Sequence, residues 1–132
     1  MAIFWREMFN TQGESTTLAD MNAGSSGTAG TYAPPLNGRL LRVALLWAGE
    51  AATSLVENLR VELECNIWKP NRLHIGLVGA GIRTAPAFPI SPFVFDVDQP
   101  VQTDMPITGQ YIHATAATPV TSNLRVFGLF QA

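Results

Sequence analysis

Apolar and polar side chains alternate without interruption from residue 59 to residue 67, inside the segment NLRVELECNIW. The odd-numbered positions carry Leu59, Val61, Leu63, Cys65 and Ile67, whereas the even-numbered positions carry Arg, Glu, Glu and Asn. A two-residue period places alternate side chains on opposite faces of an extended strand. The segment therefore predicts an antiparallel strand that buries one face. Cys65, the single cysteine of the chain, is expected as a small buried apolar side chain in it.

Five further segments predict strands, because β-branched, aliphatic and aromatic residues dominate them and turn-forming residues flank them. They cover residues 39–47, 72–79, 93–98, 109–116 and 123–130. In the first of these, we expect Leu41, Val43, Leu45 and Trp47 to share one face. Residues 49–58 are the one later segment with a helical pattern, and a strand extension is an equal alternative. Short strands with Pro- and Gly-rich connections predict an all-β fold, an antiparallel β-sandwich or jelly roll.

The segment LHIGLVGAGIRTAPAFP, residues 73–89, contains part of a dinucleotide-binding pattern. Gly79 and Gly81 supply the first two glycines of G-x-G-x-x-G, but Thr84 stands at the third position. Three prolines follow closely, and proline blocks the helix whose N-terminus would face a pyrophosphate. We therefore predict a strand that ends in a glycine-rich turn, and no nucleotide cofactor.

Only 14% of the residues are charged, compared with about 25% in a typical soluble domain. A surface with so few charges is more often an interface than a free surface. The last predicted strand supports this interpretation, because Leu124, Val126 and Phe130 alternate with Phe127 and Leu129, which makes both of its faces apolar. Its own domain covers one face, and we expect a neighbouring subunit to cover the other.

Residues 1–38 predict an extended N-terminal arm, followed by a β-sandwich domain at residues 39–132. Gly, Ser, Thr and Ala dominate residues 10–38, which leaves too little apolar surface to offset the entropy lost on ordering. Residues 1–9 form an apolar plug, which we expect to dock in a pocket of a neighbour. In the alternative, this whole segment packs back along its own domain.

Candidates for catalytic or metal-binding residues are few. His74 and His113 are the only histidines, and no nucleophile elbow is present to complete a catalytic triad. Asp96, Asp98 and Asp104 lie close in sequence but lack the Gly and Glu spacing of a calcium-binding loop. We interpret them as charges that discourage pairing of a sheet edge, and we expect no catalytic, cofactor-binding or metal-binding residues. A small β-barrel enzyme is therefore the least favoured hypothesis.

The charge distribution argues against two classes of partner. The eight basic residues are scattered from Arg6 to Arg125, and the net charge is −2. Without a basic run to follow a phosphate backbone, we expect no nucleic-acid partner. No apolar stretch reaches the length of a membrane-spanning helix, so we expect no membrane span. Residues 1–10 lack the continuous apolar region of a signal peptide.

Four aromatic residues, Tyr32, Trp47, Trp68 and Tyr111, are candidates for a platform on which a sugar ring could stack. Trp68 falls on the polar face at the end of its predicted strand, and we expect it to be exposed. An exposed aromatic platform predicts an alternative function, a carbohydrate-binding β-sandwich module. Aromatic side chains in a small sandwich more often occupy the core or an interface.

The Gly/Ser/Thr-rich arm, the charge-poor β domain with Pro-rich loops and the apolar last strand together resemble small viral capsid or capsid-decoration proteins with a jelly-roll fold. The resemblance lies in the organisation of the whole chain, and it implies a non-enzymatic structural protein of the virion shell, assembled in the host cytoplasm. Many such proteins carry a basic arm that binds the genome. Because this arm lacks that charge, the resemblance implies that it ties subunits together, as in a phage with double-stranded DNA or an archaeal virus.

The implied partners are further copies of the chain, as a homo-oligomer, and neighbouring capsid proteins. The expected assembly contacts are Ile3, Phe4, Trp5, Met8, Phe9, Tyr32, Trp68, Phe127 and Leu129.

Overall fold

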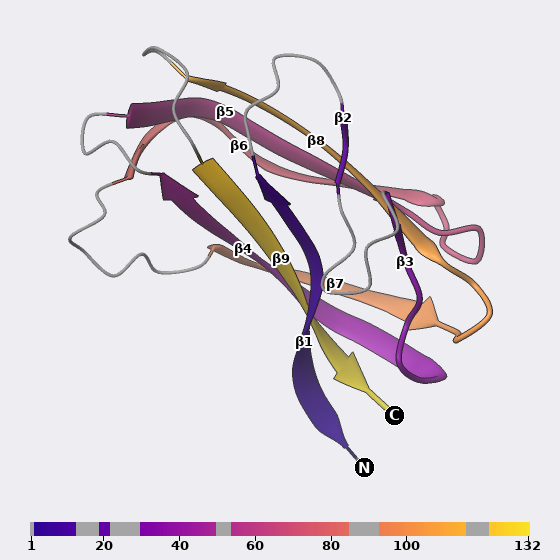
Figure 1. The fold of residues 1–132 in the computed structure, drawn as a ribbon. Helices are drawn as coiled ribbons and strands as arrows, with labels where there is room; N and C mark the ends of the chain where they lie inside the picture. The colour runs from indigo at the N-terminus through magenta and orange to yellow at the C-terminus, as the bar shows by residue number, and fades with distance from the viewer. Residues whose placement is uncertain (1, 13–18, 22–29, 50–53, 85–92, 116–121) are drawn as a thin grey trace.

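The computed structural model describes residues 2–12, 19–21, 30–49, 54–84, 93–115 and 122–132, which contain nine strands and no helix. Sheet A consists, in spatial order, of β1 (Ile3–Gln12), β9 (Ser122–Gln131), β4 (Gly38–Gly49) and β7 (Phe93–Val101). Sheet B consists of β2 (Ala19–Asp20), β8 (Ile107–Thr115), β5 (Ser54–Glu64) and β6 (Arg72–Thr84), with β3 (Thr31–Tyr32) also paired to β8. All pairings are antiparallel and the two sheets pack face to face (Figure 1), which confirms the predicted all-β sandwich.

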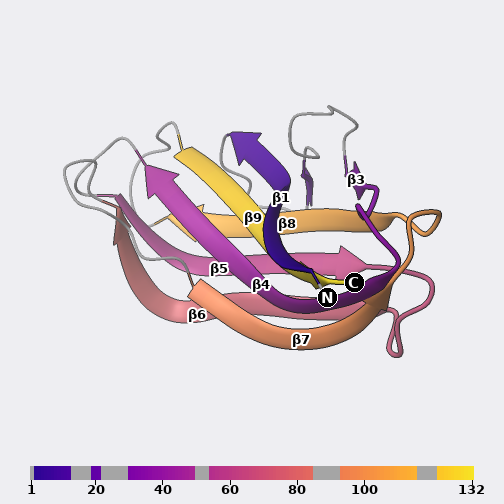
Figure 2. The same cartoon turned by 90° about the horizontal axis from the view of Figure 1, so that it is seen from below.

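The strand pairs are nested within one another along the chain. β1 pairs with β9, β2 and β3 pair with β8, β4 pairs with β7, and β5 pairs with β6. Successive pairs alternate between the two sheets, so the chain follows the path of one long hairpin wound around the core (Figure 2). This strand order is that of a jelly roll.

Side chains from both sheets meet in one core between them. Its fully or almost fully buried members are Met8, Phe9, Met21, Leu40, Val43, Leu45, Val61, Leu63, Cys65, Trp68, Ile75, Val101, Ile107, Tyr111, Leu124, Val126 and Phe130. Val61, Leu63 and Cys65 are at most 1% exposed, which confirms the predicted buried face of β5 and the buried thiol. The core therefore holds most of the alternating apolar positions that define the strands.

A β-bulge in β1 brings two neighbouring side chains into this core. The register of β1 against β9 shifts between Glu7 and Phe9, so that Met8 is an extra residue. A bulge of this kind turns consecutive side chains to the same side of the sheet. Met8 and Phe9 are both fully buried as a result, which simple alternation does not predict.

A second bulge, in β4, corrects the predicted face of that strand. The register shifts between Leu40 and Arg42 against both neighbouring strands. Leu40 is therefore fully buried together with Val43 and Leu45, whereas Leu41 is only partly buried. The prediction that Leu41 shares the core-facing side was wrong, because the extra residue changes the alternation at this point. The side chain of Trp47 lies outside the described residues.

The glycine-rich segment continues as a strand instead of ending in a turn. β6 runs through Gly79 and Gly81 to Thr84. Val78 pairs with Asn58 and Ile82 with Val56, so the glycine-containing stretch between Val78 and Ile82 bulges out of the ladder. Glycine in a strand often marks such an irregularity, and the predicted strand end at this position was wrong. Facing it, β5 begins at Ser54, which favours the strand alternative for the described part of residues 49–58.

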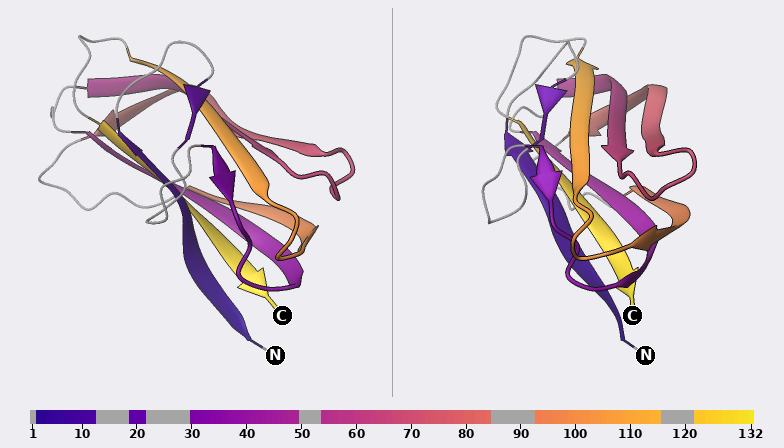
Figure 3. Two further views of the ribbon diagram at one scale, coloured as in Figure 1. Left: turned by 45° about the vertical axis from the view of Figure 1, so that its right-hand side comes forward. Right: turned by 90° about the vertical axis from the view of Figure 1, so that its right-hand side faces the viewer.

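The N-terminal segment joins the same two sheets wherever it is described. β1 is an edge strand of sheet A, and its first residues lie beside the C-terminus (Figure 3). β2 and β3 pair with β8 in sheet B. These parts follow the alternative in which the segment packs along its own domain. Residues 13–18 and 22–29, the middle of the expected arm, lie outside the described residues.

Candidate protein-interaction surface

The outer face of sheet A is the side of that sheet turned away from sheet B. Strand register arranges its side chains in rows, because residues directly opposite one another on antiparallel strands share a face. In one row, Trp5 of β1 lies opposite Leu129 of β9. In the next row, Phe127 of β9 lies opposite Ala44 of β4, which in turn lies opposite Val94 of β7. The first row continues through Arg42 and Asp96, and the second begins at Glu7, so the apolar side chains form two short runs, one over β1 and β9 and the other over β9, β4 and β7.

Three side chains on this face leave large apolar surfaces in solvent. Ile3 is 54% exposed, Trp5 46% and Val94 48%, and they are the exposed large apolar residues of the described part of the chain. Phe127 and Leu129 lie between them and are partly exposed. Concentration of such residues on one sheet face, rather than scattered single positions, is typical of a protein-binding surface.

The charged side chains on and beside this face neutralise one another. Three arginines pair with three carboxylates across neighbouring strands: Arg39 with Asp98 at 2.6 Å, Arg42 with Asp96 at 2.9 Å and Arg125 with Glu7 at 2.8 Å. The Arg39–Asp98 and Arg42–Asp96 pairs are exposed, and exposed ion pairs each stabilise a fold by only about 0–1 kcal/mol. Their main effect here is a face without net charge, on which a partner would meet neither a strong positive nor a strong negative field.

Arg125 connects the polar and apolar parts of the face. Its Nη2 donates a hydrogen bond to Oε2 of Glu7 on the edge strand, and its guanidinium lies 4.9 Å from the centre of the Phe127 ring. The hydrogen bond to Glu7 raises the pKa of Arg125 above its ordinary value, so this side chain stays charged. The arginine thereby holds β1 to β9 while its planar group covers part of an aromatic ring.

The expected assembly contacts divide into two groups. Ile3, Trp5, Phe127 and Leu129 lie together on the outer face of sheet A. The other five lie in the core or pack against it: Phe4, Met8, Phe9, Tyr32 and Trp68. The sequence pattern did not separate the two groups, because the bulge in β1 and the pairing of β1 with β9 decide which side of the segment is buried.

The expectation that Trp68 is exposed was wrong. Its side chain is 2% exposed, and its Nε1 donates a 2.7 Å hydrogen bond to the backbone carbonyl oxygen of Pro100. The residue follows the end of β5 in a turn, where strand alternation no longer applies. Tyr111 is also buried, and Tyr32 packs against the rings of Phe9 and Phe130. These residues therefore do not form an exposed sugar-binding platform.

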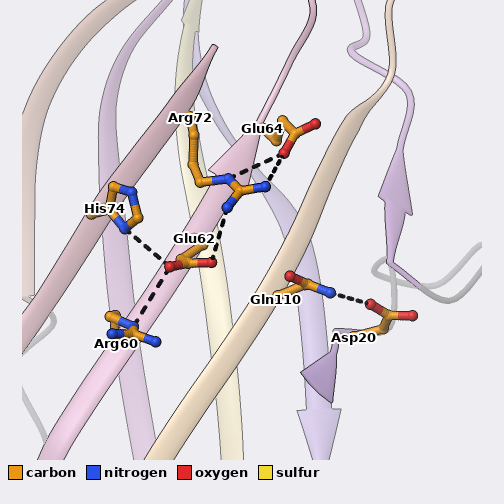
Figure 4. A network of polar contacts seen from close by, with 7 residues as sticks. All are labelled: Asp20, Arg60, Glu62, Glu64, Arg72, His74 and Gln110. Atoms are coloured by element: carbon orange, nitrogen blue, oxygen red, sulfur yellow. Dashed lines mark hydrogen bonds and ion pairs between the residues drawn. The ribbon is translucent and has the colours of Figure 1, made fainter. Parts of the chain in front are cut away.

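A polar network covers part of the outer face of sheet B (Figure 4). Its centre is Glu62, whose side chain is only 8% exposed although it points to the outer side of the sheet. One oxygen, Oε1, lies 3.1 Å from Nδ1 of His74 and 3.7 Å from Nε of Arg60, and the other, Oε2, lies 3.9 Å from Nη1 of Arg72. Arg72 also binds Glu64 at 2.6 Å.

This network has the composition of a structural ion-pair cluster. No described Ser, Thr or Cys side chain forms a hydrogen bond with His74 that would make it the base of a nucleophile. Within the described residues, no group of His, Cys, Asp and Glu has the arrangement needed to hold a metal ion. Asp96 and Asp98 pair with arginines on the other sheet, and the side chain of His113 lies outside the described residues.

Val94 and Ala44 are the members of the outer face that sequence reasoning missed. The signal was present at Val94, since it alternates with Phe93 and Phe95 and so points away from the side that they occupy. Its place in an apolar row depends on its neighbours Ala44 and Phe127, which come from strands distant in the sequence. Only the pairing of β4 with both β7 and β9 brings them together.

Two comparisons of the sequence, with protein-family models and with curated proteins, gave no match at a significant level. Among the described residues there is also no helix with the length and hydropathy needed to cross a membrane.

Proposed function

We propose that this chain is a non-enzymatic structural subunit that assembles with copies of itself and with neighbouring proteins, as a capsid or capsid-decoration protein of a virion. The observation that carries the proposal is the charge-balanced outer face of sheet A with its exposed residues Ile3, Trp5 and Val94. Burial of these side chains against a partner would remove apolar surface from water, which is the main driving force of association.

The strand order gives secondary support. Jelly-roll sandwiches are common among viral capsid proteins, although the same architecture also serves lectins and other proteins. The low fraction of charged residues agrees with a subunit whose surface is largely covered in an assembly. The virion is therefore the proposed location, and other copies of the chain are the first partners to test.

Sedimentation of the full chain at several concentrations tests the proposal. We expect the wild type to associate at micromolar concentrations. Val94→Lys replaces an exposed apolar side chain of the outer face, on the edge strand β7, with a charged one and should weaken association by about tenfold or more. Thr108→Lys is the matched control, because Thr108 is an exposed strand residue of sheet B.

Three results would each bear on the proposal differently. Weaker association of Val94→Lys, with Thr108→Lys unchanged, supports it. Equal weakening by both variants would show that the contact is not confined to sheet A. A wild type that remains monomeric up to about 100 µM would overturn self-assembly as the function.

A further inference from the structure

We propose that two copies of this chain join edge to edge through β1, whose strands pair antiparallel so that Ile3 of one copy lies opposite Trp5 of the partner subunit. Sheet A would then continue through the dimer. This inference rests on the proposed function and specifies one contact between subunits. In this contact, the free edge of β1 pairs with β1 of a second copy of the chain.

The main-chain groups of β1 alternate in direction along the strand. The N–H of Ala132 donates to the carbonyl oxygen of Ala2, and the register of β1 and β9 places these two residues opposite each other. In an antiparallel ladder, hydrogen-bonded pairs alternate with pairs whose N–H and C=O groups point away from each other. Ile3, Trp5 and Glu7 therefore direct their main-chain groups toward the free edge of sheet A.

The main-chain N–H and C=O groups of Ile3, Trp5 and Glu7 are free to bind another strand. In the part of the chain that the structure describes, β1 pairs only with β9, and no backbone partner approaches Ile3, Trp5 or Glu7 from the other side. A row of unpaired N–H and C=O groups is a template for another strand. The bulge at Met8 limits the regular part of this template to Ile3–Glu7.

The opposite edge of sheet A, formed by β7, differs from the β1 edge. β7 contains Pro100, and Asp98 has a positive φ of 46°. Proline, charges and irregular backbone are the devices with which proteins protect a sheet edge against pairing. The regular segment Ile3–Glu7 contains no proline and no residue with positive φ. Of its two charged residues, Glu7 pairs with Arg125 and Arg6 lies over the Phe4 ring, and its exposed apolar side chains are Ile3 and Trp5. One edge of sheet A is thus blocked and the other is left open.

Two-fold symmetry gives both the partner of the β1 edge and the register of the pairing. A two-fold axis makes the same segment the partner of itself, which is the commonest symmetry of homo-oligomers. An axis at Phe4 places Ile3 against Trp5 of the partner subunit, twice, so that both exposed apolar side chains are covered. An axis at Trp5 would place Ile3 against a Glu7 carboxylate, and an axis at Arg6 would place two like charges together.

The test compares two substitutions at one position. Ile3→Pro removes the N–H that points to the free edge, whereas Ile3→Ala shortens the side chain and keeps that N–H. Neither change removes a hydrogen bond to β9, so thermal unfolding of the two monomers should be closely similar. By sedimentation, we expect Ile3→Pro to dimerise about tenfold more weakly than Ile3→Ala. Equal dimerisation of the two variants would overturn edge pairing.

Cysteine cross-linking tests the register. In the proposed pairing, oxidation of an equimolar mixture of Ile3→Cys and Trp5→Cys chains gives a disulfide-linked dimer, because the two positions are opposite. Each variant alone should give little, and Cys65 is buried and should not contribute. Efficient cross-linking of Trp5→Cys alone would overturn the axis at Phe4.

The two proposals fail in different ways. If the wild type and Thr108→Lys associate, Val94→Lys does not, and Ile3→Pro equals Ile3→Ala, then the outer face of sheet A mediates assembly without β1 pairing. If the wild type does not associate at all, both proposals fail. A stoichiometric complex with a different protein that Ile3→Pro abolishes, without self-association, would assign the edge to that protein and overturn the second copy as its partner.

Discussion

The indole Nε1 of Trp68 donates a 2.7 Å hydrogen bond to the backbone carbonyl oxygen of Pro100, and this bond connects the turn after β5 in sheet B to β7 in sheet A. The indole itself is almost fully buried. A single side chain therefore fills the core at this end of the sandwich and satisfies a main-chain acceptor of the facing sheet. Buried polar groups that lose such a partner are expensive to leave unpaired.

Trp68→Phe should therefore reduce the free energy of unfolding by about 1–3 kcal/mol, because it removes the donor and leaves the Pro100 carbonyl unpaired. Unfolding in urea, followed by circular dichroism, measures the loss. Trp5→Phe is the matched control, since Trp5 is 46% exposed on the outer face, and it should change stability by less than about 0.5 kcal/mol. Equal effects of the two substitutions would contradict a structural role for the indole N–H.

Among the strands of the described residues, β4 to β9 were predictable because the local pattern of side chains decides them, whereas β1, β2 and β3 lie in the segment that was expected to be an arm. In β5 the alternation around Val61 and Leu63 identifies both the strand and its buried face. The bulges at Met8 and Leu41 were not predictable in this way. An extra residue changes the register against the partner strand, and the local sequence does not show that register. The burial of Trp68 could not be predicted from a local pattern either, since its hydrogen-bond partner lies 32 residues later in the chain.

The candidate surface was predictable only in part, for the same physical reason. The apolar character of β1 and β9 placed Ile3, Trp5, Phe127 and Leu129 among the expected assembly contacts, together with residues that are buried in the core. That these residues share one face follows from the antiparallel register of two strands at opposite ends of the chain. Neither register nor sheet order is encoded in the composition of a single segment.

Gly128→Ala should destabilise the fold by about 1–3 kcal/mol through overpacking. A Cβ at this position would lie 2.8 Å from Cδ1 of Leu40 and 2.9 Å from the ring of Phe130, in the middle of the core. Thermal and urea unfolding measure the effect. Because Leu40→Val removes the nearest atom, it should recover part of the loss in the double variant, and strictly additive effects would show that the two positions do not compete for space.

Glu62→Gln should reduce stability by about 1–3 kcal/mol, although its neighbours on the outer face of sheet B are exposed. The substitution removes the charge that the Arg60 and Arg72 guanidinium groups face, and the side chain it alters is almost fully buried. Glu64→Gln is the control, because its side chain is more exposed and should change stability by less than about 1 kcal/mol. The difference between the two variants in urea unfolding measures the effect of burial. No difference would mean that burial does not strengthen the Glu62 pairs.

The fold should lose stability in alkaline solution as the buried Tyr111 and the partly buried Tyr32 ionise. Burial raises the pKa of Tyr32 and of Tyr111 above the ordinary value of 10.0, so the folded state favours the neutral phenol. Since the pKa is higher in the folded state, this contribution is fully present below pH 10 and is lost as the pH rises through the folded pKa. The free energy of unfolding should be flat from about pH 7 to 9 and fall above about pH 10.

Tyr32→Phe isolates the contribution of one tyrosine to the loss of stability at alkaline pH. The variant should fall less steeply with pH than the wild type above about pH 10, because it has no phenol to ionise against the packed rings of Phe9 and Phe130. Urea unfolding at a series of pH values provides the comparison. Identical slopes for the two proteins would show that the pKa of Tyr32 is the same in the folded and the unfolded state.

Association of the chain with itself should depend only weakly on salt. The arginines on and beside the outer face of sheet A already pair with carboxylates of the same face, so a second copy meets little net charge there. Screening shortens the range of charge interactions between subunits but leaves apolar burial intact. The Kd measured by sedimentation between about 50 and 500 mM NaCl should therefore change by less than about threefold. A Kd that rises about tenfold or more over this range would mean that charged groups, and not the apolar rows around Trp5 and Val94, hold the subunits together.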